Sequence, residues 1–141
     1  LYFTSTSRES ADIIKEQVKN VNDKNEKSIE AMHQLKEQSK MMKEALLKGK
    51  LHQVGEILDF GFEQKRLMAH KISNSDIEAI YDAAKKAGAT GGKISGAGGG
   101  GFMIFYCPGN TRYKVIETLN TFGGEIKNYS FTKYGLTTWT I

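Results

Sequence analysis

The stretch Lys93-Ile-Ser-Gly-Ala-Gly-Gly-Gly-Gly-Phe102 decides how this chain is organised. Seven of the fifteen glycines fall between Gly91 and Gly101. Glycine loses more conformational freedom on folding than any other residue, so four in succession need a physical reason. Either backbone N–H groups converge on an anion there, or another segment of the chain passes very close. Both alternatives predict a tight loop that excludes side chains, and the first indicates phosphate chemistry.

Length and composition exclude several classes of protein. The 141 residues suffice for one domain with a real core, and 26% charged residues with 10% aromatics are typical of a globular chain. The net charge of +4 comes from lysines that alternate with apolar residues, which is typical of solvated helix faces and not of a nucleic-acid-binding stripe. No apolar run approaches the roughly 20 residues of a membrane span, and no signal peptide is visible. We therefore expect a cytoplasmic protein that binds neither nucleic acid nor membrane.

Helix signals fill the part of the chain before the loop. Thr6 to Glu9 fits a capping box with Thr6 as N-cap, and a long amphipathic helical stretch then continues to Gly49. A second helix begins near Leu51. Ser75 to Glu78 predicts a further helix with Ser75 as N-cap and Gly88 at its C-terminal cap. The apolar stripes defined by these spacings are Ile14, Val18, Val21, Ile29, Met32, Leu35, Met42 and Leu46; Val54, Ile57, Leu58 and Phe62; and Ile77, Ile80, Tyr81, Ala84 and Ala87.

After Gly88 the pattern changes to that of strands. The run from Phe102 to Cys107 reads as a buried strand, with Cys107 as a small buried apolar residue. A short helix from Tyr113 to Leu119 follows. Residues 125–131 and 135–141 then predict two strands of a hairpin, with Trp139 in the core, and the opening residues Leu1 to Thr4 read as the end of another strand. This order predicts an α+β fold with helices packed on one face of a small antiparallel sheet.

Two common phosphate loops do not fit. Gly96 to Gly101 formally satisfies G-x-G-x-x-G, but that fingerprint follows a strand and opens a helix, whereas a strand follows here. A P-loop around Gly92-Lys93 would need glycine in place of Ala87 and a hydroxyl in place of Ile94. We therefore predict neither a dinucleotide fold nor a P-loop NTPase.

A third pattern does fit. Lys93 to Phe102, after the lead-in Gly88-Ala-Thr-Gly-Gly92, resembles the third signature motif of the GHMP kinases, which include galactokinase, homoserine kinase and mevalonate kinase. Ser73 to Ala89 and Thr4 to Ser10 are similar to one branch, the D-glycero-D-manno-heptose 7-phosphate kinases. The resemblance implies that residues 1–141 form the ferredoxin-like C-terminal domain of such an enzyme. It also implies that the N-terminal domain, with its Pro-x-x-x-Gly-Leu-Gly-Ser-Ser-Ala loop, lies outside this chain.

The resemblance further implies a function. The intact protein would transfer a phosphoryl group from ATP to the anomeric hydroxyl of a heptose 7-phosphate, and this chain alone would be inactive. ATP and Mg²⁺ would be bound mainly by the N-terminal kinase domain. The expected partners of this chain are that domain and the sugar phosphate, and a homo-oligomer is left open. The site residues expected in this chain are Lys93, Ser95, Gly96, Ala97, Gly98, Gly99, Gly100 and Arg8, and no catalytic or metal-ligating residue is expected.

Several alternatives remain open at this point. Ser95 either donates its hydroxyl to substrate or holds the turn, and Lys93 either faces the phosphates or is solvated at the sheet edge. Arg8 contacts either a sugar phosphate or a carboxylate. Gly98→Val is expected to leave folding largely intact and abolish transfer. A different class of function, a non-catalytic assembly module built on the Lys-rich helices between residues 10 and 70, also remains; a nucleic-acid binder ranks third.

Overall fold

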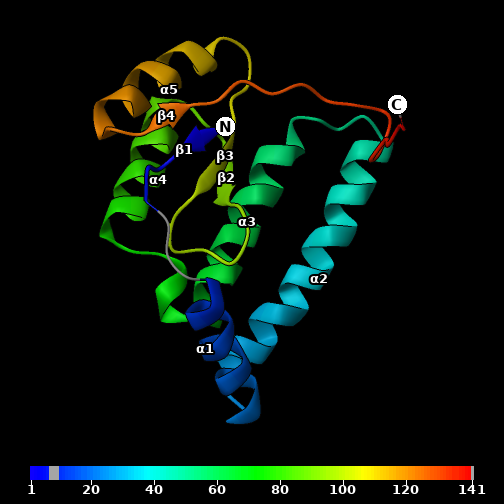
Figure 1. The fold of residues 1–141 in the computed structure, drawn as a ribbon, viewed down its shortest axis with the longest axis vertical. Helices are drawn as coiled ribbons and strands as arrows, with labels where there is room; N and C mark the ends of the chain where they lie inside the picture. The colour runs from blue at the N-terminus through cyan, green and yellow to red at the C-terminus, as the bar shows by residue number, and fades with distance from the viewer. Residues whose placement is uncertain (7–9, 141) are drawn as a thin grey trace.

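Figure 1 shows helices on one side of a small sheet, with α1 and α2 extending away from it. The computed structural model describes residues 1–6 and 10–140. In chain order the elements are β1 (Tyr2–Phe3), α1 (Ser10–Asn22), α2 (Glu26–Leu47), α3 (Gln53–Met68), the 3-10 helix η1 (His70–Ile72), α4 (Ser75–Ala87), β2 (Gly91–Ile94), β3 (Phe102–Tyr106), α5 (Thr111–Leu119), the 3-10 helix η2 (Asn120–Phe122) and β4 (Glu125–Ile126). No helix in these ranges is both long enough and apolar enough to cross a membrane.

The sheet has the strand order β2-β3-β1-β4, and every neighbouring pair is antiparallel. Tyr2 lies opposite Met103 on one side and Ile126 on the other, so the two-residue strand β1 occupies an inner position. This is the order of the split βαβ, or ferredoxin-like, arrangement. The α+β fold with an antiparallel sheet is therefore confirmed.

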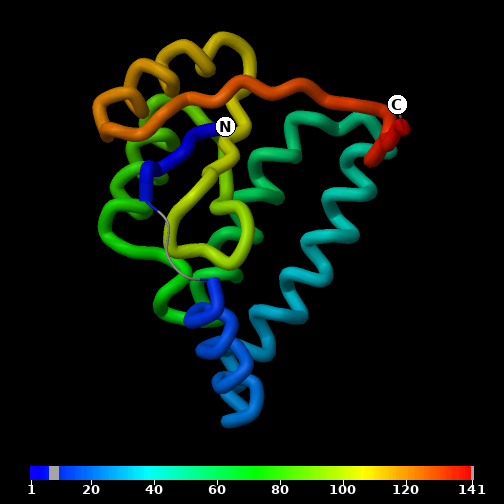
Figure 2. The backbone as a smooth tube through the Cα atoms, viewed as in Figure 1, coloured from blue at the N-terminus to red at the C-terminus, as the bar shows by residue number. Residues whose placement is uncertain are grey.

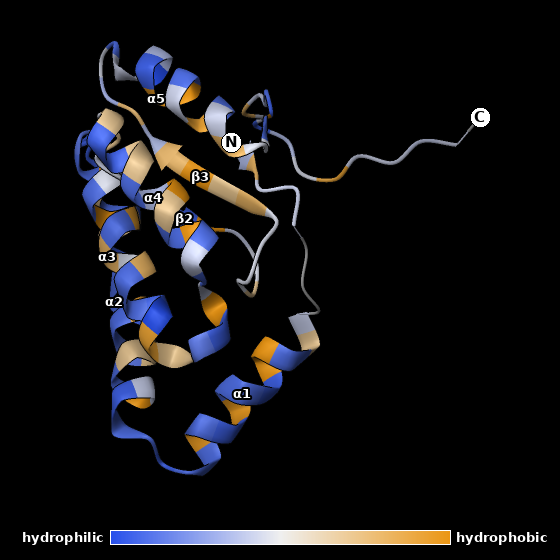
Figure 3. Cartoon of the chain, turned by 90° about the vertical axis from the view of Figure 1, so that its left-hand side faces the viewer, coloured by the Kyte–Doolittle hydropathy of each residue, from blue (hydrophilic) through white to orange (hydrophobic). Residues whose placement is uncertain are grey.

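The main core lies between the sheet and the helices α3, α4 and α5. Tyr2, Ile94 and Met103 each have 0% exposure and contribute from the sheet. The other members are Phe62, Ile77, Ile80, Tyr81, Ala84, Ala87, Ala89, Val115 and Leu119. Figure 3 shows the apolar colouring of β3 where it meets these helices. Cys107, expected to be buried, is only half-buried at the rim of this core, and that partial burial raises the pKa of its thiol.

A second, smaller core forms beneath the glycine loop. It joins α1, α2 and the end of α3 to η1, and its buried members are Ile13, Ala31, Met68, Ala69 and Ile72. Ala97 of the loop packs against it. The loop is therefore attached to the helical part of the molecule as well as to the sheet.

The predicted continuous helix up to Gly49 is wrong, because it is two helices. The chain turns at Lys24, which has a φ of +53°. Asn25 then caps α2 by accepting a hydrogen bond from the Ser28 N–H at 3.0 Å. The capping box predicted at Thr6 extends over residues 7–9, which lie outside the described residues.

The predicted stripe on these two helices is also largely wrong. Ile14, Val18 and Met32 are 51%, 53% and 42% exposed. Ile13 and Ala31 are buried in the second core instead, and of the predicted stripe Leu35 packs against that core.

The helix α4 begins one residue earlier than predicted. Its N-cap is Asn74, whose side-chain oxygen accepts hydrogen bonds from the N–H groups of Asp76 and Ile77 at 3.1 and 3.0 Å. Ser75 is exposed at the first helical position. The predicted C-cap is confirmed, because Gly88 adopts the left-handed region with a φ of +116°.

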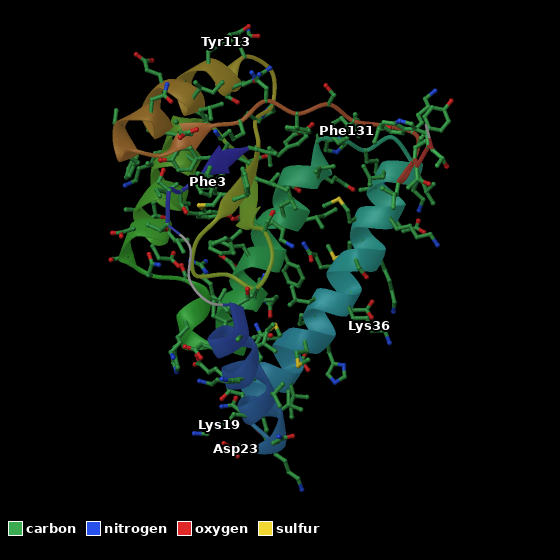
Figure 4. The ribbon with its side chains drawn as sticks, viewed as in Figure 1. Phe3, Lys19, Asp23, Lys36, Tyr113 and Phe131 are labelled. Atoms are coloured by element: carbon green, nitrogen blue, oxygen red, sulfur yellow. The ribbon has the colours of Figure 1, made fainter. Side chains whose placement is uncertain are left out.

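The predicted C-terminal hairpin is wrong. Only Glu125–Ile126 forms a strand, and it pairs with β1 and not with residues 135–140. Residues 127–140 run out from the sheet as an extended segment without a strand partner among the described residues, as Figures 2 and 3 show. Trp139 is 80% exposed and Phe131, labelled in Figure 4, is 92% exposed. The alternating pattern is strand-like, but a strand needs backbone hydrogen bonds to a neighbouring strand. After the bond from the Lys127 N–H to the Leu1 carbonyl at 3.0 Å, no further backbone–backbone bond is described for this segment.

Candidate phosphate-binding site

The glycine loop, residues 95–101, joins β2 to β3. The strand β2 was not predicted from the sequence. Because β2 pairs with β3, the loop closes an antiparallel hairpin, and the Ser95 N–H donates to the Phe102 carbonyl at 2.7 Å across the base of this hairpin. Five of its glycines have positive φ values: Gly96 (+72°), Gly98 (+121°), Gly99 (+76°), Gly100 (+154°) and Gly101 (+87°). L-residues with a side chain rarely adopt this region, so the backbone path itself requires glycine.

One side of the loop is anchored to neighbouring chain segments. The Gly99 N–H donates to the Ile72 carbonyl at 2.7 Å, and the Gly101 N–H donates to the Thr6 carbonyl at 2.7 Å. A Cβ atom on Gly98 would lie 2.7 Å from the Ile72 oxygen, and one on Gly100 would lie 2.6 Å from the Thr6 oxygen. Close approach of other chain segments therefore explains these two glycines. Gly98→Val would disturb the fold, contrary to the sequence-based expectation.

Several N–H groups of the loop have no acceptor among the described residues. Within the described ranges, the N–H groups of Gly96, Ala97, Gly98 and Gly100 make no hydrogen bond. Gly96 is exposed, and a Cβ atom there would meet nothing within 4 Å. Unpaired N–H groups on a tight glycine loop are suited to donate hydrogen bonds to the oxygens of a phosphate. Figure 1 shows this loop hanging from β2 and β3 beside α3.

Two lysines border the loop, and the sequence indicated only one of them. Lys93 lies half-buried in the edge strand β2. Lys65, in the last turn of α3, donates its Nζ to the Gly96 carbonyl. Burial, together with the positive charge of Lys93, lowers the pKa of Lys65 to about 8. Lysines are frequent throughout these helices, so no local pattern distinguished Lys65; only the fold brings it to the loop.

Two further residues, Ser95 and Arg8, were also predicted to belong to the site. Ser95 closes the hairpin through its N–H, while its hydroxyl makes no hydrogen bond to any other described residue. Arg8 lies outside the described residues. The described residues also hold no group of three or more His, Cys, Asp or Glu side chains that could bind a metal ion.

A polar network behind the loop holds β2 against the helices. The Tyr81 hydroxyl donates to Asp59, and the Lys85 Nζ lies 2.7 Å from Asp59 Oδ2 while donating to the Thr90 carbonyl at 3.0 Å. Burial, reinforced by the Asp59 carboxylate, raises the pKa of Tyr81. Since Thr90 directly precedes β2, this network fixes the strand that carries Lys93.

Close packing of α3 on β2 depends on glycines outside the loop. A Cβ atom on Gly91 would lie 1.9 Å from the Gly55 carbonyl, and one on Gly55 would lie 1.9 Å from the Thr90 hydroxyl. Both positions therefore need glycine for α3 to lie directly against the strand. This contact is what brings Lys65 and Lys93 to the same side of the loop.

Comparisons with known proteins agree with this geometry. The chain is 39% identical over its whole length to a D-glycero-alpha-D-manno-heptose 7-phosphate kinase of Campylobacter jejuni, of which it covers 41%. It is 38% identical over 75 residues to a mevalonate kinase of Methanothermobacter thermautotrophicus, covering 53% of this chain and 24% of that protein. The chain thus spans less than half the length of these curated relatives.

Solved structures give the same fold. A crystal structure of L. major mevalonate kinase with R-mevalonate matches 85% of this chain and 36% of its own, with a TM-score of 0.77 at 21% identity. A Campylobacter jejuni protein described as a sugar kinase matches 98% of this chain and 37% of its own, with a TM-score of 0.63 at 36% identity. Residues 42–125 match the family described as "GHMP kinases C terminal". This match covers more than half of the chain, and the chain therefore belongs to the GHMP kinase C-terminal family.

Proposed function

We propose that this chain is the C-terminal domain of an ATP-dependent kinase that phosphorylates the anomeric hydroxyl of a heptose 7-phosphate. The observation that carries the proposal is the 39% identity to a heptose 7-phosphate kinase along the entire chain, from Leu1 to Ile141. The glycine loop supports it, because N–H groups without an acceptor among the described residues, beside two lysines, suit a phosphorylated substrate.

Each part of the loop has a distinct role in this proposal. Phosphoryl transfer depends on positioning and on stabilisation of charge, and fixed backbone N–H groups provide both without moving. Gly96, Ala97, Gly98 and Gly100 supply those groups, while Gly99 shapes the loop through its bond to Ile72. Lys93 adds a positive charge at the edge, and Ser95 and Arg8 are further candidates for contact with the sugar phosphate.

ATP and Mg²⁺ are assigned mainly to the N-terminal domain. The described residues of this chain offer N–H and ammonium donors, which fit phosphate oxygens, and they lack a cluster of metal-ligating side chains. Bound Mg²⁺ would neutralise charge on the ATP phosphates. In this proposal the present chain orients the acceptor, is inactive without the N-terminal domain, and acts in the cytoplasm.

The test is an ADP-release assay on the full-length protein against a panel of sugar phosphates and small alcohols, including sedoheptulose 7-phosphate and heptose 7-phosphates. We expect turnover with a heptose 7-phosphate and a 1,7-bisphosphate product. Turnover with another alcohol only would keep the kinase activity and reject the heptose acceptor. A folded protein that binds no ATP and turns over no acceptor would overturn the proposal in favour of a non-catalytic assembly module.

A further inference from the structure

Lys65 at the end of α3 and Lys93 in β2 are half-buried lysines that border the glycine loop, and neither has a described carboxylate partner. Neither residue takes part in a salt bridge in the ranges that the structure describes. Several carboxylates of α2, α3 and α4 pair with other groups: Glu63 and Glu78 with Arg66, Asp59 with Lys85, Glu37 with Lys40, and Glu44 with Lys48. Two like charges that are partly desolvated together are unfavourable unless an anion joins them.

The neighbouring Arg66 shows what a structural cation at this position looks like. Its guanidinium pairs with Glu78 on α4 and lies 4.8 Å from the centre of the Phe62 ring. Lys65, one residue earlier, turns instead to the glycine loop, where its Nζ donates to the Gly96 carbonyl. A lysine can donate three hydrogen bonds, so this ammonium retains donors for a second oxygen ligand.

From this geometry we infer that Lys65 and Lys93 together bind one phosphoryl group at the edge of the glycine loop. Lys65 fixes the position of the phosphate against the loop, because it is held at Gly96, and Lys93 supplies the second charge from β2. The inference deepens the proposed function, on which it rests for the nature of the substrate. Two sources carry this chemistry, the phosphate of the acceptor sugar and the phosphates of the nucleotide.

The direct test is a calorimetric titration of the full-length protein with inorganic phosphate. Lys65→Met and Lys93→Met should each weaken phosphate binding at least tenfold at pH 7, because each removes a charge-assisted hydrogen bond. The matched control is Lys86→Met, which changes an exposed lysine in the last turn of α4 and should bind phosphate like the wild type. A wild-type protein that binds no phosphate, or a folded Lys65→Met protein with unchanged binding, would overturn the inference.

Lys65→Arg provides a measurement that a merely structural role would not affect. In the wild type, phosphate binding should weaken as the pH rises above about 8, where Lys65 loses its proton under the influence of burial and Lys93. Arginine stays protonated, so the variant should keep its affinity up to pH 9.5. This variant also retains the donor to Gly96 and decides the matter if Lys65→Met does not fold. Identical pH profiles for both proteins would contradict the inference.

Steady-state kinetics separate the two sources of phosphate. In Lys65→Met and Lys93→Met, a rise of tenfold or more in KM for the sugar phosphate, with KM for ATP unchanged, assigns the site to the acceptor. A rise in KM for ATP, with KM for the sugar phosphate unchanged, assigns the site to the nucleotide. Unchanged values for both, with unchanged phosphate binding, reject the site. If no heptose phosphate is turned over but Lys65→Met still loses phosphate binding, the proposed function fails and the phosphate site stands.

Discussion

At the scale of single residues, the glycines of the loop differ in why they are glycine. Gly98 and Gly100 lie against the backbone of other segments, whereas Gly96 faces open space and is glycine only for its φ of +72°. Gly123 shares this property, with a φ of +74° and nothing within 4 Å of a Cβ position, and it lies far along the chain from the loop. The pair allows backbone strain to be separated from function.

We predict that Gly96→Ala and Gly123→Ala each lower the free energy of unfolding by about 1–2 kcal/mol, the usual cost of a left-handed alanine. Only Gly96→Ala should also reduce turnover, because its methyl group stands on the open side of the loop. Denaturant unfolding and the kinase assay on the full-length protein measure the two effects. Equal turnover in both variants would remove Gly96 from the proposed site.

Gly98 should behave differently from Gly96. Its alanine variant combines a φ of +121° with a contact of 2.7 Å to the Ile72 carbonyl, so the loop must shift away from η1. We expect a loss of stability of more than about 2 kcal/mol, from the added strain and overpacking. If Gly98→Ala loses no more stability than Gly96→Ala in the same denaturation experiment, η1 moves away from the loop at little energetic cost.

Lys65 should leave a signature in the pH dependence of stability. Its pKa is about 8 in the folded protein and near the ordinary 10.5 when unfolded, so between these values the unfolded chain binds more protons. The contribution of Lys65 to the free energy of unfolding therefore rises as the pH increases from about 8 to 10.5. The difference in unfolding free energy between wild type and Lys65→Met, measured across this range, should show that rise; a flat difference would contradict the lowered pKa.

The sequence located the loop but not the whole site. The run from Lys93 to Phe102 was distinctive because glycine is expensive to fix, and so its importance was visible without coordinates. Lys65 was not visible, since it reaches the loop from 31 residues away through the packing of α3 on β2. The division of the loop into an anchored and an open side was equally inaccessible, because it depends on where Ile72 and Thr6 pass.

At the scale of the elements, the start of α4 offers a test with a built-in control. Asn74→Ala should destabilise the protein by about 1 kcal/mol, because it removes the acceptor of two helix N–H groups. Ser75→Ala, at the residue that the sequence indicated as the cap, should change stability by no more than about 0.5 kcal/mol, since exposed positions away from caps are tolerant. Thermal unfolding of both variants is the measurement, and equal losses would restore Ser75 as the cap.

Most helices and strands were predicted from local signals, whereas the strand β2 and the break between α1 and α2 were not. The helices α3, α4 and α5 and the strand β3 have clear periodicity bounded by glycine or proline. The strand β2 begins with two glycines, which disfavour strands locally, and it forms because β3 and α3 lie on either side of it. The break before α2 depends on Lys24 in a left-handed conformation, for which lysine carries no sequence signal.

At the scale of the whole molecule, the segment 127–140 stands apart from both cores. Its large apolar side chains are Tyr129, Phe131, Tyr134, Leu136 and Trp139, with exposures from 55% to 96%. The chain has a single tryptophan, so fluorescence reports on this segment alone. In this chain we predict the emission of a water-exposed indole, nearly unchanged on unfolding. A blue-shifted emission that moves to the red on unfolding would show that the segment packs.

The inner position of β1 has a consequence for synthesis on the ribosome. The Tyr2 hydroxyl accepts a hydrogen bond from the N–H of Gly124, 122 residues later in the chain, at 2.9 Å. At about 5–20 residues per second, ribosomes need roughly 6 to 24 s to add that length. During this interval the helices can form while the sheet still lacks strands that pair with β1. A nascent chain stalled before β4 should therefore expose the edge of β1 that pairs with β4, and such an exposed edge is accessible to chaperones and proteases.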